Sequence, residues 1–142
     1  MNIMRFIIPK SLVQTLRTDQ TVRQASEIMK YHRYTALPII DEDGRYAGTV
    51  RGDDLFRYYF DAKGDKDGER SSVMTVVDPH YLKPLSHDAS LDRLMEEVIE
   101  HNFVPVTDDR GCFIGIILRR EILGYLLRFY RERQNEAVQT SI

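Results

Sequence analysis

The chain has 142 residues, enough for about one globular domain, and its 42% apolar and 30% charged residues are ordinary for a folded protein. Its 20 Lys and Arg against 22 Asp and Glu leave a formal net charge of −2, which excludes the strongly basic field of a protein that binds nucleic acid non-specifically. The single cysteine, Cys112, excludes both a disulfide framework and a cysteine-based metal site.

The first half of the chain predicts one small unit of strands and helices. Thr21 and Gln24 have the spacing of a capping box, in which each side chain satisfies a backbone amide at the start of a helix. Val22, Ala25 and Met29 then place apolar residues at helical spacing. Further along, two short apolar runs flank an acidic turn that ends in glycine, which predicts a β-hairpin. The expected elements are an entering strand near 13–15, a helix at 22–32, strands at 36–40 and 46–50 around a turn at 41–44, and a closing helix at 53–60.

A segment of mixed charge follows at 61–70. It contains two glycines and no apolar anchor beyond Ala62, so it predicts a solvated linker. A calcium loop is the alternative for its acidic part, but residues 65–68 lack the full ligand spacing and the closing glutamate of such a loop.

The second half predicts the same elements in the same order. Ser90 takes the place of Thr21 as the helix cap, and Leu91, Leu94 and Val98 form the apolar stripe of the helix. The expected elements are a helix from residue 91, strands at 103–107 and 113–118 around a turn at 108–111, and a closing helix at 120–133.

The two halves are copies of one repeat. Prolines, glycines, acids and apolar positions recur in the same order at a nearly constant offset, which chance does not explain. Neither copy has enough core to be comfortable alone, so we expect the two sheets to pack together. We place the first repeat at 1–60, a charged linker at 61–72, and the second repeat with an extended C-terminal helix at 73–142. The clearest matches are 37–44 with 104–111, Gly48 with Gly115, and Asp54 with Glu121.

The two copies resemble the paired CBS domains, a family also called the Bateman module. The family has a proline-containing strand and, before the last helix, the pattern Gly-apolar-apolar-(Ser/Thr)-x-x-Asp. The resemblance implies an α/β (α+β) fold of two β-α-β-β-α repeats packed with pseudo-two-fold symmetry. The segments that carry it are YTALP at 34–38 and GTVRGDDL at 48–55 in the first copy, and NFVP at 102–105 and GIILRREI at 115–122 in the second.

The resemblance also implies a role. CBS pairs bind adenosine-containing ligands (AMP, ADP, ATP, S-adenosylmethionine or cyclic di-AMP) between the repeats, and they act as sensors rather than enzymes. A closer resemblance, carried by residues 34–36, 98–104 and the Arg119-Arg120 pair, is to stand-alone CBS proteins of Gram-positive bacteria that bind cyclic di-AMP. Those proteins form dimers and change the activity of partner enzymes according to ligand occupancy.

Three charged residues are candidate ligand contacts. Asp54 matches the acid that in this family holds the ribose hydroxyls, a role that suits two carboxylate oxygens; the alternative is that it only favours a helix start. Arg119 and Arg120 lie at a helix N-terminus, where the macrodipole disfavours cations, and a bound phosphate would remove that conflict. The alternative is a pair of solvated arginines. Because Gly52 and Asp53 hold the matching positions in the first copy, the two clefts should differ in charge.

We expect one main ligand cleft assembled from both copies. Residues 34–36 contact the adenine, Asp54 holds the ribose, and the two arginines reach across to the phosphates, while the segment at 13–15 supplies a further wall. Arg51 and Leu118 depart from the family's Ser/Thr, and the lysine expected in the entering segment of a cyclic di-AMP binder is replaced near Val13. The candidate ligand-binding residues are Val13, Gln14, Thr15, Tyr34, Thr35, Ala36, Asp54, Arg119 and Arg120.

The leading interpretation is a cytoplasmic, homodimeric sensor of an adenine nucleotide, first of all cyclic di-AMP, that regulates a partner enzyme or transporter. An AMP, ADP or ATP sensor is the alternative within this class, and a ligand-free dimerisation scaffold is the alternative outside it. Enzyme activity is not expected, since the sequence lacks a nucleophile–base pair, a glycine-rich phosphate loop and a metal cluster. No cofactor, metal, nucleic acid or membrane partner is expected, because the four histidines lack ligand spacing and no apolar run approaches the ~20 residues of a membrane span.

Overall fold

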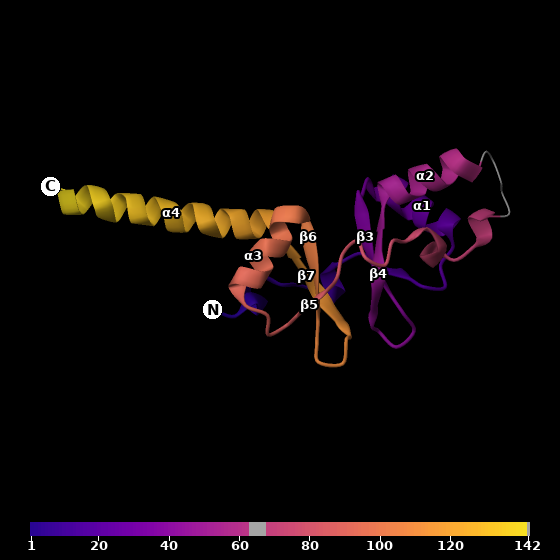
Figure 1. The fold of residues 1–142 in the computed structure, drawn as a ribbon, viewed down its shortest axis with the longest axis horizontal. Helices are drawn as coiled ribbons and strands as arrows, with labels where there is room; N and C mark the ends of the chain where they lie inside the picture. Colours follow the sequence, from indigo (N-terminus) through magenta and orange to yellow (C-terminus); the bar gives the residue numbers. More distant parts are fainter. Residues whose placement is uncertain (63–67, 142) are drawn as a thin grey trace.

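The computed structural model describes residues 1–62 and 68–141 and shows two α/β units side by side, with one long helix projecting from the second unit (Figure 1). The predicted fold of two repeats is confirmed. In chain order the first half holds 3-10 turns η1 (Ile3–Phe6) and η2 (Lys10–Leu12), strands β1 (Ile8–Pro9), β2 (Leu16–Arg17), β3 (Ala36–Ile40) and β4 (Tyr46–Arg51), and helices α1 (Val22–His32) and α2 (Gly52–Ala62).

The second half repeats the order of strand, helix, two strands and helix that begins at β2. Its 3-10 turns are η3 (Gly68–Arg70) and η4 (Val73–Val76), its strands are β5 (Leu85–Ser86), β6 (Phe103–Thr107) and β7 (Phe113–Leu118), and its helices are α3 (Leu91–Glu100) and α4 (Arg119–Ser141). The prediction ended the last helix at residue 133, but α4 continues to Ser141 because no proline or glycine interrupts 134–141. Part of the predicted linker, residues 63–67, lies outside the described residues.

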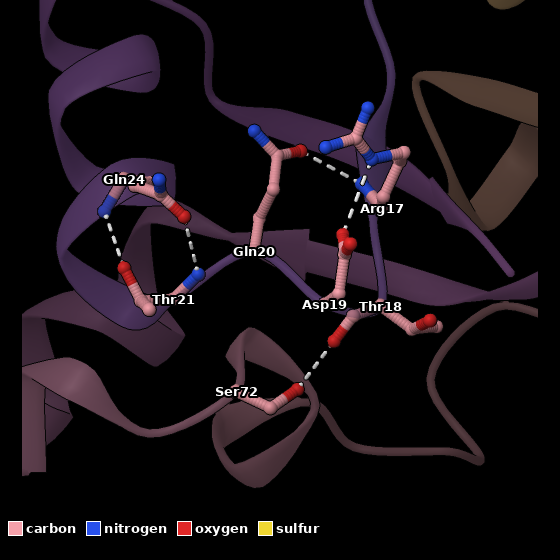
Figure 2. A network of polar contacts seen from close by, with 7 residues as sticks. All are labelled: Arg17, Thr18, Asp19, Gln20, Thr21, Gln24 and Ser72. Carbon is pink, nitrogen blue, oxygen red and sulfur yellow. Dashed lines mark hydrogen bonds and ion pairs between the residues drawn. The ribbon is translucent and has the colours of Figure 1, made fainter. Parts of the chain in front are cut away.

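The start of α1 shows how local sequence fixes an element (Figure 2). The Thr21 hydroxyl accepts from the Gln24 amide at 3.1 Å, and the Gln24 side chain accepts from the Thr21 amide at 2.9 Å, so the predicted capping box is present. Ser72 lies beside it and donates its hydroxyl to the Thr18 carbonyl at 2.7 Å. The end of the predicted linker is therefore fixed against the first repeat.

Each repeat has its own sheet and its own apolar core. Each core also contains a residue from the segment that precedes the other repeat in the chain. The sheet of the first repeat has the order β2-β3-β4, and the second sheet has the order β1-β7-β6-β5. Strand β1 thus leaves the N-terminal segment and pairs with β7, and Ile3 is buried in the core of the second repeat. Val73 is buried in turn in the core of the first repeat. The N-terminal segment therefore packs in the second repeat, and the segment before the second repeat packs in the first.

The tips of the two hairpins join the repeats through equivalent residues. The amide of Tyr46 donates to the Gly111 carbonyl at 3.2 Å, and the amide of Phe113 donates to the Gly44 carbonyl at 2.9 Å. Gly44 and Gly111 have φ of 82° and 79°, a left-handed conformation that glycine adopts without steric cost. The two hydrogen bonds join equivalent residues of the repeats, as the pseudo-two-fold symmetry implied by the resemblance requires.

Among the described residues, each helix is too short or too polar to cross a lipid bilayer.

Candidate functional site

Two clefts open between the repeats and share Tyr34, Ala36 and Phe103 as a common wall. We call the first the Arg51 cleft. It has a volume of about 350 Å³, and the start of β3, the start of α2 and the end of α3 meet there. Its lining residues are Tyr34, Thr35, Ala36, Arg51, Gly52 and Asp53 from the first repeat, and Tyr81, Leu82, His101, Asn102 and Phe103 from the second.

We call the second the Arg119 cleft. It consists of an apolar hollow of about 240 Å³ and a charged hollow of about 410 Å³, which share Leu118. The apolar hollow is lined by Ile8, Leu12, Val13, Gln14, Tyr34, Ala36, Leu37, Pro38, Phe103, Ile116 and Leu118. The charged hollow is lined by Asn102, Leu118, Arg119, Arg120 and Leu123.

In the Arg51 cleft the only arginine in the lining is already paired. Arg51 donates Nη2 to Asp54 Oδ1 at 2.9 Å, and it donates both Nε and its backbone amide to Asp54 Oδ2 at 3.2 and 2.8 Å. These hydrogen bonds raise the pKa of the Arg51 guanidinium, so it stays protonated. The guanidinium also lies 3.9 Å from the centre of the Tyr81 ring, a cation–π contact with the segment that enters the second repeat.

Tyr46 makes a second connection to the same wall. Its hydroxyl donates to the Leu82 carbonyl at 2.8 Å and lies 2.7 Å from the Thr49 hydroxyl. Burial raises the pKa of Tyr46 to about 12, so the hydroxyl keeps its proton at neutral pH. The inner wall of the Arg51 cleft is therefore held by hydrogen bonds from both repeats.

In the Arg119 cleft the cations have weaker partners. Arg119 donates Nε to the Val98 carbonyl at 2.6 Å and Nη2 to the Ile99 carbonyl at 3.3 Å, both at the C-terminal end of α3. The side chain of Arg120 is 82% exposed and reaches the Glu121 carboxylate only at 4.0 Å. Carbonyl groups satisfy the donors of an arginine but do not neutralise its charge, so this cleft keeps a positive field at the start of α4.

The structure divides the predicted site residues between the clefts. Val13, Gln14, Tyr34 and Ala36 lie together in the apolar hollow, next to the hollow that holds Arg119 and Arg120. Thr35 lines the Arg51 cleft. Asp54 is buried behind Arg51 and lines a separate hollow with Arg57, Tyr58, Asp61 and Val76, and Thr15 lines neither cleft. Asp54 and the two arginines are therefore not brought to one cavity.

Sequence reasoning missed several lining residues. Ile8 and Ile116 enter the Arg119 cleft because β1 pairs with β7, and Ile8 lies directly opposite Ile116 in that pairing. Tyr81 and His101 line the Arg51 cleft and contact each other edge to face, with ring centres 5.1 Å apart. Ile8 and Tyr81 belong to no motif, whereas Ile116 and His101 lie in the segments 115–122 and 98–104 that carry the resemblance, and the offset of 67 residues between the repeats matches His101 to Tyr34.

One polar cluster lies away from both clefts. The side chain of His87 is 2.9 Å from Asp109 Oδ1, and Asp88 accepts the Ser86 hydroxyl at 2.6 Å. The hydrogen bond to Asp109 raises the pKa of His87. The ligand atoms of His87, Asp88 and Asp109 lie within 4.8 Å of one another, a juxtaposition that spacing along the chain does not reveal. Both carboxylates are exposed, and the hydrogen bond between His87 and Asp109 accounts for the contact of these two side chains.

Two β-α-β-β-α repeats with ligand-sized clefts between them define a CBS domain pair. The CBS domain model matches residues 8–61 and 73–128, so the chain belongs to the CBS domain family. Among curated relatives, the inosine-5'-monophosphate dehydrogenase of Methanocaldococcus jannaschii is 27% identical over 111 residues, which are 78% of this chain and 21% of that enzyme. The chain thus spans about a fifth of the length of the curated relatives it matches, and it shares with them the CBS portion.

Solved structures show the same fold. CbpB in complex with c-di-AMP superposes with a TM-score of 0.84 at 20% identity, over 96% of this chain and 91% of that one. CBSX2 in complex with AMP superposes with a TM-score of 0.74 at 22% identity, over 91% of this chain and 98% of that one. At this level of identity the likeness establishes the fold alone.

Proposed function

We propose that this protein is a regulatory CBS pair that binds an adenine nucleotide, first of all cyclic di-AMP, in the Arg119 cleft. The observation that carries the proposal is the juxtaposition of an apolar hollow with a hollow that contains two arginines free of strong carboxylate pairing. A nucleotide has the same two parts, since its base is flat and weakly polar and its phosphate is anionic.

The residues suggest how such a ligand lies. The adenine packs between Tyr34, Ala36 and Val13, and the Gln14 amide lies at the same wall to hydrogen-bond the base edge. The phosphates meet the guanidinium groups of Arg119 and Arg120 at the N-terminus of α4, where the macrodipole also favours an anion. Contacts from Thr15, Thr35 and Asp54 remain predictions outside this arrangement.

Two similar structures guide the choice of ligand. CbpB was solved with c-di-AMP and CBSX2 with AMP, so both compounds have adenosine and phosphate in common. Cyclic di-AMP adds a second adenine and a second phosphate, which suits a cleft with two arginines and an extended apolar wall. AMP, ADP and ATP form the alternative within the same class.

A ligand panel tests the proposal. Cyclic di-AMP should raise the melting temperature of the full chain, and a ligand present at 100 times its dissociation constant should add about 2.7 kcal/mol of stability. AMP, ADP, ATP and S-adenosylmethionine are compared in the same thermal-shift assay, and calorimetry gives the affinities. If none of these compounds stabilises the protein, the chain is a ligand-free scaffold and the proposal is wrong.

We further propose that the protein is a homodimer joined through its closing helices. The repeat places exposed apolar side chains at equivalent positions on α2 and α4, although each helix also faces its own core. Such a recurring apolar face suits a symmetric homodimer, because a two-fold contact with a second chain would cover the exposed face of α2 and that of α4 together. The equivalent pairs are Phe56 and Leu123, Tyr59 and Leu126, and Phe60 and Leu127.

Charge placed on this face should separate the dimer. Phe60→Asp combined with Leu127→Asp should raise the dimer dissociation constant by roughly 100-fold, because two carboxylates would lose their hydration in the contact. Light scattering at a series of concentrations measures the change. Val138→Asp is the matched control, since Val138 is exposed on α4 but lies beyond the recurring face. A double variant that stays dimeric, or a control that dissociates equally, contradicts this interface.

Ligand occupancy can then act on a partner. The cleft lies between the repeats, so a ligand that fits one arrangement of the repeats better shifts the population toward it. We propose that a partner enzyme or transporter reads that shift. The enzymes among the curated relatives share only the CBS portion with this chain, which supports a regulatory rather than a catalytic role.

A further inference from the structure

The acid of the first repeat is occupied by the chain itself. Both oxygens of Asp54 accept hydrogen bonds from Arg51, three in total when the backbone amide is included. A carboxylate offers about four acceptor positions, so little capacity remains for the two hydroxyls of a ribose. The Asp54 side chain is only 3% exposed and that of Arg51 is 26% exposed, so the guanidinium stands between the carboxylate and the Arg51 cleft.

We propose that Arg51 is a specificity-determining residue that occupies the place of a ribose and keeps the Arg51 cleft closed to adenosine. Together with the proposed function, on which this part rests, it makes each chain a sensor with a single nucleotide cleft. In the other cleft, Leu118 occupies the position of the second repeat that is equivalent to Arg51. A leucine has no hydrogen-bond donor in its side chain, so it cannot hold a carboxylate in this way. The two clefts therefore differ in access as well as in charge.

Two contacts keep Arg51 in this position. The bidentate pairing with Asp54 fixes the plane of the guanidinium, and the Tyr81 ring covers one face of it at 3.9 Å. A ribose entering the cleft would have to displace both contacts at once. A phosphate entering it would also meet the carboxylate of Asp53, which holds the place of Arg120 in the repeat.

Arg51→Ser should open the Arg51 cleft. The serine removes the guanidinium but keeps the backbone amide that Asp54 accepts, so the start of α2 retains this bond while the carboxylate regains free acceptor positions. Adenosine is the probe because it carries the ribose without the charge of a phosphate. We expect saturable shifts of the Gly52 and Asp53 amide resonances when adenosine is added to R51S, and none in the unmodified chain.

Two further variants make the result specific. The double variant R51S with Asp54→Asn should bind adenosine at least about tenfold more weakly than R51S alone, because the hydrogen bonds from the ribose to the Asp54 carboxylate are lost. Arg23→Ser is the matched control, because it removes an arginine that forms an exposed ion pair with Glu27 on α1. This variant should show no adenosine-induced shifts of the Gly52 and Asp53 amides, like the unmodified chain. Melting curves of each variant show that it is folded.

The outcomes separate this inference from the proposed function. Saturable shifts in the unmodified chain, or their absence in folded R51S, overturn the role of Arg51. Nucleotide binding at the Leu118 and Arg119 amides is followed in the same spectra and tests the proposed function. If R51S gains adenosine while no nucleotide reaches Arg119, the inference stands and the proposed function fails.

Discussion

Gly115→Ala should destabilise the protein by roughly 3 kcal/mol, a loss typical of overpacking against immovable backbone. A Cβ at Gly115 would collide with the Ile8 carbonyl and lie 2.8 Å from Ile7 Cγ1. The carbonyl belongs to β1, where Pro9 lies opposite Gly115, so it cannot move without breaking the pairing with β7. Because β1 also carries Ile8 into the Arg119 cleft, nucleotide affinity should fall as well.

The first repeat contains the matched control. A Cβ at Gly48 would lie 3.0 Å from Val77 Cγ1 and 3.8 Å from Met74 Cε, which are side-chain atoms that can shift. Gly48 and Gly115 have φ of 151° and 157°, so backbone strain is common to both substitutions, and we expect Gly48→Ala to cost about 1–2 kcal/mol less than Gly115→Ala because it lacks the collision with backbone. Urea unfolding curves of the two variants give the comparison. Equal losses would mean that the N-terminal segment does not pack on β7.

Local patterns were sufficient for most of the elements, although the entering strand expected near 13–15 lies at Leu16–Arg17. The capping box of Thr21 and Gln24, and the acidic turns that end in Gly44 and Gly111, act within four residues of the chain, so their geometry is encoded where it occurs. The strands at 36–40 and 103–107 were predicted with the bounds that the structure has. The repeat then supplied the family and the existence of two clefts.

Contacts between distant segments were not predictable from the chain. Nothing in the sequence around Ile3 indicates that it packs in the core of the second repeat, since an apolar residue fits either core equally. Arg119 was taken as a phosphate contact, and its bonds to the Val98 and Ile99 carbonyls depend on how α4 meets α3. Asp54 and Arg51 are close in sequence, but their pairing requires a particular rotamer that only the folded cleft selects.

The arginine pair should have the largest effect on ligand binding. The double variant Arg119→Ala and Arg120→Ala should bind cyclic di-AMP or AMP about 100-fold more weakly, because each substitution removes charged hydrogen bonds to phosphate. Arg120→Ala alone should weaken binding about tenfold with unchanged stability, since its side chain is 82% exposed. Arg119→Ala should also lower stability by about 1 kcal/mol, because the last carbonyls of α3 lose their donor. Calorimetry and urea unfolding separate these two losses.

Arg51→Ala decides which cleft the phosphates use. If they lie in the Arg119 cleft, removal of Arg51 should leave the affinity of that cleft for cyclic di-AMP and AMP, followed at the Leu118 and Arg119 amides, nearly unchanged, because the Arg51 guanidinium faces Asp54 and Tyr81. If affinity instead falls more in Arg51→Ala than in the Arg119 and Arg120 double variant, the phosphates lie in the Arg51 cleft.

Raising the salt concentration should weaken binding in the unmodified chain and much less in the double variant, because the exposed arginines supply the attraction that salt screens.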